Sequence, residues 1–118
     1  MAVIASIIWY GRSGEPYKYR VYDIAEPIGR APGNFLLAKQ IHHSDWKVLY
    51  VGQTADLSKH LARDPGVACA ISRGASHVHI SKNERGEEMR RREVADLIAR
   101  WKPPCNVPRR DAERVQAR

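Results

Sequence analysis

Residues 33–54, GNFLLAKQIHHSDWKVLYVGQT, hold two apolar runs separated by a polar segment. The runs GNFLLAKQ and WKVLYVGQT are strand-like, and the polar IHHSD between them suits a turn. We therefore predict an antiparallel hairpin that starts at about Gly33 and has Tyr50 and Gly52 at the exit of its second strand.

The segment before this hairpin contains a second pair of strand-like runs. VIASIIWY and YKYRVYDI flank the turn-rich GRSGEP, which predicts an N-terminal hairpin within residues 1–30. The aromatic residues of this hairpin lie beside Lys18 and Arg20 and could stack the bases of a single strand. Cross-strand aromatic packing explains the same residues more simply.

Short helices and one strand are expected after Thr54. In TADLSKHLARD, Thr54 or Asp56 can cap a short helix, DPG would end it, and VACAISRG predicts a second short helix closed by Gly74. SHVHISKN alternates as a strand does. Its two histidines could join His60 in a metal site, but solvent-facing histidines on an edge strand are the simpler interpretation.

A longer amphipathic helix is expected near the C-terminus. Apolar residues recur there at i, i+3, i+4 and i+7, namely Val94, Leu97, Ile98 and Trp101. Pro103 and Pro104 stop this helix, and its arginines, Arg90 to Arg92 among them, predict a solvated face with salt bridges.

These elements predict an α+β fold, a small antiparallel sheet of hairpins flanked by helices, in a single domain of residues 1–108. The chain of 118 residues carries a formal net charge of +7, which favours polyanionic partners such as nucleic acid. The basic tail of residues 109–118, through Arg109, Arg110 and Arg114, is a candidate arm for phosphate contacts.

The cysteines and the N-terminus suggest where the protein works. Cys69 and Cys105 lie far apart and form no Cys-x-x-Cys pattern, which predicts two free thiols in a reducing cytoplasm. The apolar start MAVIASIIWYGRSG lacks a charged leading region and is too short to span a bilayer. We therefore expect a cytoplasmic protein with no signal peptide and no membrane partner.

The order of these motifs resembles that of the GIY-YIG nuclease family. LYVGQT, with Tyr50 and Gly52, is similar to the family's second signature strand, and GNFLL, with Gly33, stands in place of the first. LIARWKPPCN is similar to the closing helix and asparagine segment. The resemblance covers residues 33–106 and implies an extra N-terminal hairpin ahead of the family core.

The resemblance implies metal-assisted hydrolysis of phosphodiester bonds, with Mg²⁺ or Mn²⁺ as the metal. It favours DNA over RNA as the nucleic acid that is bound. Tyr50 would lie beside the scissile phosphate and position water. Phe35 stands where the family has a tyrosine and lacks the hydroxyl. His60 replaces the family's helix arginine, and a neutral imidazole lacks the fixed charge that suits phosphate.

The metal-binding glutamate of the family corresponds to Val94, which lies on the apolar stripe. Glu93 is rotated by about 100° around the helix and could serve only if the helix were shifted or the side chain bent back. Asn106 matches the family's asparagine, which braces the site.

The sequence therefore predicts a GIY-YIG-like domain that binds nucleic acid and cleaves it weakly or not at all. The alternative is an active endonuclease in which Glu93 holds the metal, Tyr50 positions the nucleophile, and His60 or Arg63 supports the phosphate. A third hypothesis is a protein-interaction module in which the edge of the N-terminal hairpin pairs with a partner strand.

Overall fold

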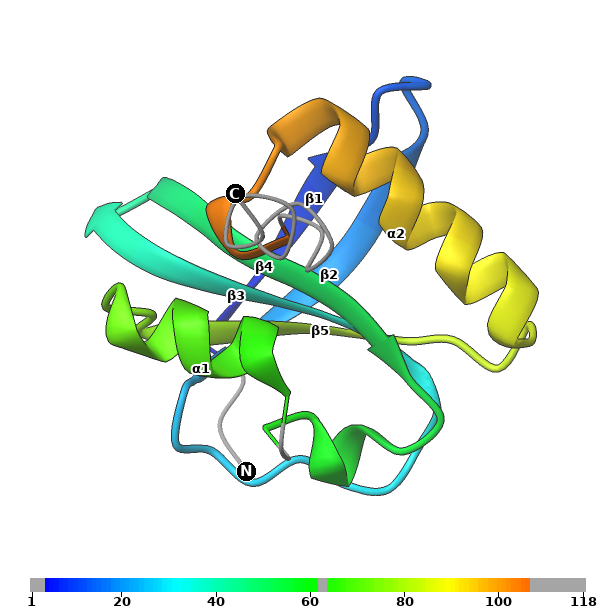
Figure 1. Cartoon of the computed structure of the whole chain (residues 1–118), viewed down its shortest axis with the longest axis horizontal. Coiled ribbons are helices and arrows are strands. Elements are labelled where there is room, and N and C mark those ends of the chain that lie inside the picture. Colours follow the sequence, from blue (N-terminus) through cyan, green and yellow to red (C-terminus); the bar gives the residue numbers. More distant parts are fainter. Residues whose placement is uncertain (1–3, 62–63, 107–118) are drawn as a thin grey trace, which may run out of the picture.

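The computed structural model describes residues 4–61 and 64–106. Within these ranges the chain forms one five-stranded antiparallel sheet, with helices packed against it (Figure 1). The spatial order of the strands is β1 (Ala5–Tyr10), β2 (Pro16–Asp23), β5 (His77–Lys82), β3 (Gly33–His42) and β4 (Asp45–Thr54). The helices are α1 (Pro65–Ser72) and α2 (Glu87–Trp101), with short 3₁₀ helices η1 (Leu57–Lys59) and η2 (Pro104–Asn106). The predicted α+β class is confirmed.

Both predicted hairpins are present, and β5 joins them into one sheet. β1 pairs with β2 and β3 pairs with β4, while β5 inserts antiparallel between β2 and β3. In the second hairpin Leu37 lies opposite Tyr50, but the next residue, Ala38, lies opposite Val48. Leu49 is therefore the extra residue of a β-bulge, which explains why the adjacent Leu49 and Tyr50 both pack on one side of the sheet.

The sheet separates two hydrophobic cores. The α1-side core contains the buried Tyr22, Ile28, Phe35, Leu37, Leu49, Leu57, Val67, Ala70, Val78 and Ile80. The α2-side core contains Trp9, Tyr19, Leu36, Ala38, Val48, Val51 and Leu97. Because side chains alternate along a strand, β3 supplies Phe35 and Leu37 to one core and Leu36 and Ala38 to the other.

The expected helix in residues 54–61 is only the single turn η1. Asp56 caps it, as predicted, by accepting a hydrogen bond from the Ser58 backbone N–H. The prediction that DPG ends a helix is wrong, because these residues begin α1. Asp64 caps the helix by accepting from the Gly66 N–H, and Pro65, which has no N–H to satisfy, occupies its first turn.

The amphipathic stripe on α2 is confirmed. Leu97 is buried in the α2-side core, and Val94, Ile98 and Trp101 pack against it. Two of the expected i,i+4 pairs form, Arg91 with Glu87 and Arg92 with Glu88. Arg90 departs from the solvated face, because it is buried and donates to Gln53 and to the Asn83 carbonyl. Among the described residues, no helix combines the length and the apolar character that crossing a lipid bilayer demands.

The prediction of two free thiols is wrong, because Cys69 and Cys105 form a disulfide. Their Cα atoms are 5.7 Å apart, although the residues are separated by 36 positions in the sequence. The bond joins α1 to η2, which follows α2. The inference of a reducing compartment rested on free thiols and loses that support.

The prediction that His77 and His79 face solvent on an edge strand is also wrong. β5 lies between β2 and β3, and His79 is fully buried on the α2 side of the sheet. Its ring packs against Trp46, with centroids 4.7 Å apart, and its Nδ1 accepts a hydrogen bond from the Trp9 indole N–H at 3.0 Å. Burial lowers the pKa of His79 to about 3, and the neighbouring His77 adds to the effect.

We expect the double variant Cys69→Ala/Cys105→Ala to have a free energy of unfolding about 2–4 kcal/mol lower than the parent, because the closed loop restricts the unfolded chain. Urea titration followed by circular dichroism measures the difference. A dithiol reductant should lower the stability of the parent protein and leave the double variant unchanged. Equal stability of the parent with and without reductant would contradict a stabilising bond.

We also expect the free energy of unfolding to fall as the pH is lowered from 6.5 to about 4.5. The unfolded chain protonates His79 near its ordinary pKa of 6.5, whereas the folded chain does so only near 3. The unfolded state therefore binds more protons in this window, and His79 alone contributes a slope of ~1.4 kcal/mol per pH unit. Urea titrations at successive pH values measure the slope.

The comparison for this slope is His79→Gln, whose amide oxygen can still accept from the Trp9 indole and does not titrate. In this variant the slope should be shallower by the amount that His79 contributes. The same slope in both proteins would show that the imidazole is not held neutral by the fold.

Candidate functional site

Tyr50 is part of a hydrogen-bonded contact between β4 and the start of α1. Its hydroxyl donates to Asp64 Oδ2 at 2.9 Å, and the other oxygen of Asp64 caps α1. A Cβ added to Gly66 would lie 2.1 Å from the Tyr50 ring, so the ring packs directly on the glycine backbone. Burial and the Asp64 carboxylate both raise the pKa of Tyr50. Tyr50 therefore keeps its proton at neutral pH and fixes the start of α1.

Phe35 and His60 lie beside Tyr50 on the α1 side of the sheet. The Phe35 ring centroid is 6.0 Å from those of Tyr50 and His60. His60 is 5% exposed, and its Nδ1 lies 2.7 Å from the Leu57 carbonyl, so this nitrogen donates and the buried Nε2 has no partner among the described residues. Burial lowers the pKa of His60, which is therefore neutral and closes the end of η1.

The two signature glycines permit close packing in this region. A Cβ at Gly52 would lie 2.7 Å from the Phe35 ring, and a Cβ at Gly33 would lie 2.5 Å from the Ser81 carbonyl oxygen. Both distances are too short for a side chain. The glycines thus have a structural role in the sheet whatever the protein binds.

Glu93 lies on the other side of the sheet. Its Oε1 accepts from Asn34 Nδ2 at 3.2 Å and from Asn83 Nδ2 at 3.0 Å, and its Oε2 lies 3.4 Å from an Arg85 nitrogen. Asn34 precedes Phe35 in β3, so their side chains point to opposite faces of the sheet. Tyr50, Phe35 and His60 therefore form one group, and Glu93 is not part of it.

The residues do not fit the divalent cation that the family resemblance implies. Both oxygens of Glu93 already bind nitrogen donors, and its neighbours Asn34, Asn83 and Arg85 bring no second carboxylate. Nowhere in residues 4–61 and 64–106 do three His, Cys, Asp or Glu side chains come together as a metal site would require. The three-histidine site does not form either, because His60 and His79 lie on opposite sides of the sheet.

Asn106 braces the edge strand β4. Its Oδ1 accepts from the Val51 N–H at 2.8 Å, and its Nδ2 donates to the Val51 carbonyl at 2.9 Å. The side chain thus pairs with the strand as a neighbouring backbone would. Four residues predicted to bind phosphate, Arg63, Arg109, Arg110 and Arg114, lie outside the described residues.

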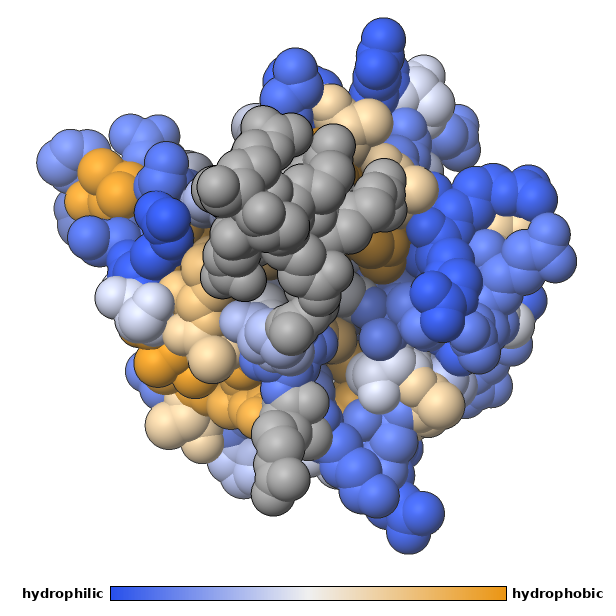
Figure 2. Space-filling model, in the orientation of Figure 1, coloured by the Kyte–Doolittle hydropathy of each residue, from blue (hydrophilic) through white to orange (hydrophobic). Residues whose placement is uncertain are grey.

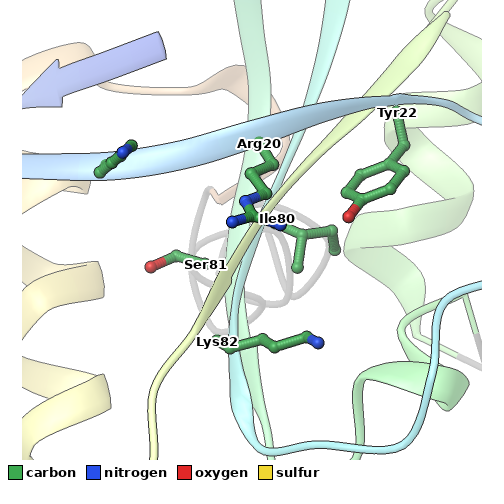
Figure 3. A pocket seen from close by; sticks show the side chains of 6 residues that line it. Arg20, Tyr22, Ile80, Ser81 and Lys82 are labelled. Atoms are coloured by element: carbon green, nitrogen blue, oxygen red, sulfur yellow. The ribbon is translucent and has the colours of Figure 1, made fainter. Parts of the chain in front are cut away.

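The structure contains a hollow lined by basic side chains, the cationic hollow, which the sequence pattern did not reveal. It has a volume of about 300 Å³ and is lined by Lys18, Arg20, Tyr22, Ile80, Ser81 and Lys82. In Figure 3, Ile80 and Ser81 leave β5 on opposite sides, and the Tyr22 hydroxyl approaches Ile80. None of the ion pairs formed among the described residues involves its three cations.

The hollow lies where no helix covers the sheet on the α1 side. α1 packs over β3 and β4, while Lys18 and Arg20 come from β2 and Lys82 comes from the end of β5. Figure 2 shows that hydrophobic residues gather over α1, whereas hydrophilic residues cover α2. The spacing of Lys18 and Arg20, two residues apart, indicates that both lie on one face of a strand. The sequence does not show that Lys82 joins them, because this depends on the pairing of β2 with β5.

Comparisons with protein-family models, with curated proteins and with solved structures give no match to this chain.

We expect Glu93→Ala to lower the free energy of unfolding by about 1–3 kcal/mol, because Asn34 and Asn83 would lose the acceptor of their partly buried amides. Glu88 on the same helix is the matched control, since its side chain is 91% exposed whereas that of Glu93 is 12% exposed. Glu88→Ala should be nearly as stable as the parent. Urea titration of the three proteins gives the comparison. Unchanged stability of Glu93→Ala would contradict a stabilising role for its hydrogen bonds with Asn34 and Asn83.

Proposed function

We propose that this chain is a nucleic-acid-binding domain that contacts phosphates through Lys18, Arg20 and Lys82 and cleaves its ligand weakly or not at all. The observation that carries the proposal is the cationic hollow, in which these three side chains surround one space and form no ion pair with a described residue. The formal net charge of +7 acts in the same direction.

The pairing of β2 with β5 brings these cations to one hollow. The paired residues of β2 and β5 end at Arg20 and Ile80, and Lys18 and Lys82 lie just beyond that pair, where both line the hollow. Like charges that line one hollow repel one another. A polyanion would remove this repulsion, because each phosphate could interact with two neighbouring cations.

The family resemblance supports binding more than it supports cleavage. The chain order of β3, β4, helices, β5, α2 and η2 follows the order of the motifs that suggested a GIY-YIG-like domain. Efficient hydrolysis would need a group that activates water and a positive charge near the phosphate. The side chains at the corresponding positions, Phe35, neutral His60 and Val94, offer neither.

The test replaces the three cations together, as Lys18→Ala/Arg20→Ala/Lys82→Ala, and measures binding of a labelled oligonucleotide by fluorescence anisotropy at several salt concentrations. Three lost phosphate contacts should make the plot of log affinity against log salt less steep by about 2. The same reactions, incubated with Mg²⁺ or Mn²⁺, should give few or no cleavage products.

The matched control removes three cations elsewhere, as Lys39→Ala/Lys47→Ala/Arg73→Ala. Lys39 and Lys47 lie opposite each other, but they occupy the far end of the β3–β4 hairpin and line no part of the hollow. This variant should lose much less affinity. An equal loss in both triple variants would reduce the effect to net charge, and unchanged binding in the first variant would contradict the proposal.

A further inference from the structure

The outer strand of the sheet presents hydrophobic side chains beside the cationic hollow. Ile8 and Tyr10 of β1 are 50% and 51% exposed, and Ile4, just before the strand, is 56% exposed. Ile8 lies opposite Lys18 in the register of β1 and β2. Since cross-strand partners share a face, the Ile8 side chain and the cation lie next to each other on the uncovered side of the sheet.

The opposite side of β1 is firmly packed. Trp9 is buried in the α2-side core, and its ring meets Trp101 edge-on with centroids 5.0 Å apart. The Trp101 indole N–H donates to the Tyr10 carbonyl at 2.9 Å. The backbone that carries Tyr10 is therefore held in place from behind, while about half of its side chain faces solvent.

Tyr10 and Ile8 follow each other at alternate positions, so they lie on one face about 7 Å apart along the strand. A row of exposed apolar side chains next to a row of cations matches an unpaired nucleic-acid strand, which has bases along one side and phosphates along the other. In a duplex the faces of the bases are stacked on one another and cannot reach a protein ring.

We infer that the ligand of this face is a single-stranded nucleic acid, with bases against Tyr10 and Ile8 and phosphates in the cationic hollow. This inference rests on the proposed function and adds the strandedness of the ligand and the residues that contact its bases. Binding on such a surface tolerates different sequences, because every base has a flat face that can stack on an aromatic ring.

The test uses three labelled probes of equal length, namely oligo(dT), a duplex and an abasic oligonucleotide. The parent protein should bind oligo(dT) more tightly than the duplex and the abasic strand. Tyr10→Ala should weaken binding of oligo(dT) by about 5- to 150-fold, the range found for one stacked base, and should leave binding of the abasic strand unchanged. Tyr10→Phe, which keeps the ring, should bind within about twofold of the parent.

Two further variants test whether the loss of binding is specific to the exposed apolar side chains of β1. Ile41 is 49% exposed at the far end of β3, so Ile41→Ala is the matched control for loss of an exposed apolar side chain and should bind as the parent does. Ile8→Ala should weaken binding of oligo(dT) in the same direction as Tyr10→Ala. Circular dichroism spectra establish that each variant is folded.

The outcomes separate this inference from the proposed function. If Tyr10→Ala binds oligo(dT) as the parent does, or if the abasic strand binds as tightly as oligo(dT), the stacking inference fails while phosphate binding stands. If no probe binds, the proposed function fails as well. An oligoglutamate probe that binds as tightly as oligo(dT) would instead indicate an acidic peptide as the partner of this face.

Discussion

Strand β3 carries the constraint on which the rest of the fold depends, because it is covered on both faces. Every residue of Gly33–Ala38 is buried, and β5 and β4 flank the strand on its two sides. A strand in this position must be apolar throughout or must satisfy each polar group locally. Asn34, the polar side chain in the run, does so by donating to Glu93 of α2. The glycine at its start admits the neighbouring strand closely, and the two helices are held apart by the sheet between them.

The parts of the fold that depend on local periodicity could be predicted from the sequence. Strand-like runs on either side of turn-forming segments predicted both hairpins, the i, i+3, i+4, i+7 spacing predicted α2, and Asp56 was a recognisable cap. DPG was predicted to end a helix but begins one, because Pro suits the first turn of a helix as well as the residues beyond its end. The burial of His79 and the pairing of Cys69 with Cys105 depend on which distant segments meet, and no local pattern contains that information.

In the candidate site, too, some features follow from the sequence and others depend on the tertiary structure. Packing roles for Phe35 and Val94 followed from residue type alone, because neither side chain can exchange a proton or hold a cation. The position of Glu93 relative to Tyr50 required the tertiary structure, since it depends on the face of β3 that each one contacts. The hollow formed by Lys18, Arg20 and Lys82 was missed for the same reason, as only the pairing of β2 with β5 brings the third cation to the other two.

The disulfide has a consequence for the covalent connectivity of the molecule. It closes residues 69–105 into a ring that contains all of β5 and α2, so the strand beside the hollow and the helix that covers the second core belong to one cycle. Cutting one peptide bond inside this cycle opens the ring but leaves both new ends attached to the same molecule. A protease that nicks the 83–86 connection between β5 and α2 would therefore release no fragment. Separation of the pieces would require reduction of the Cys69–Cys105 bond as well.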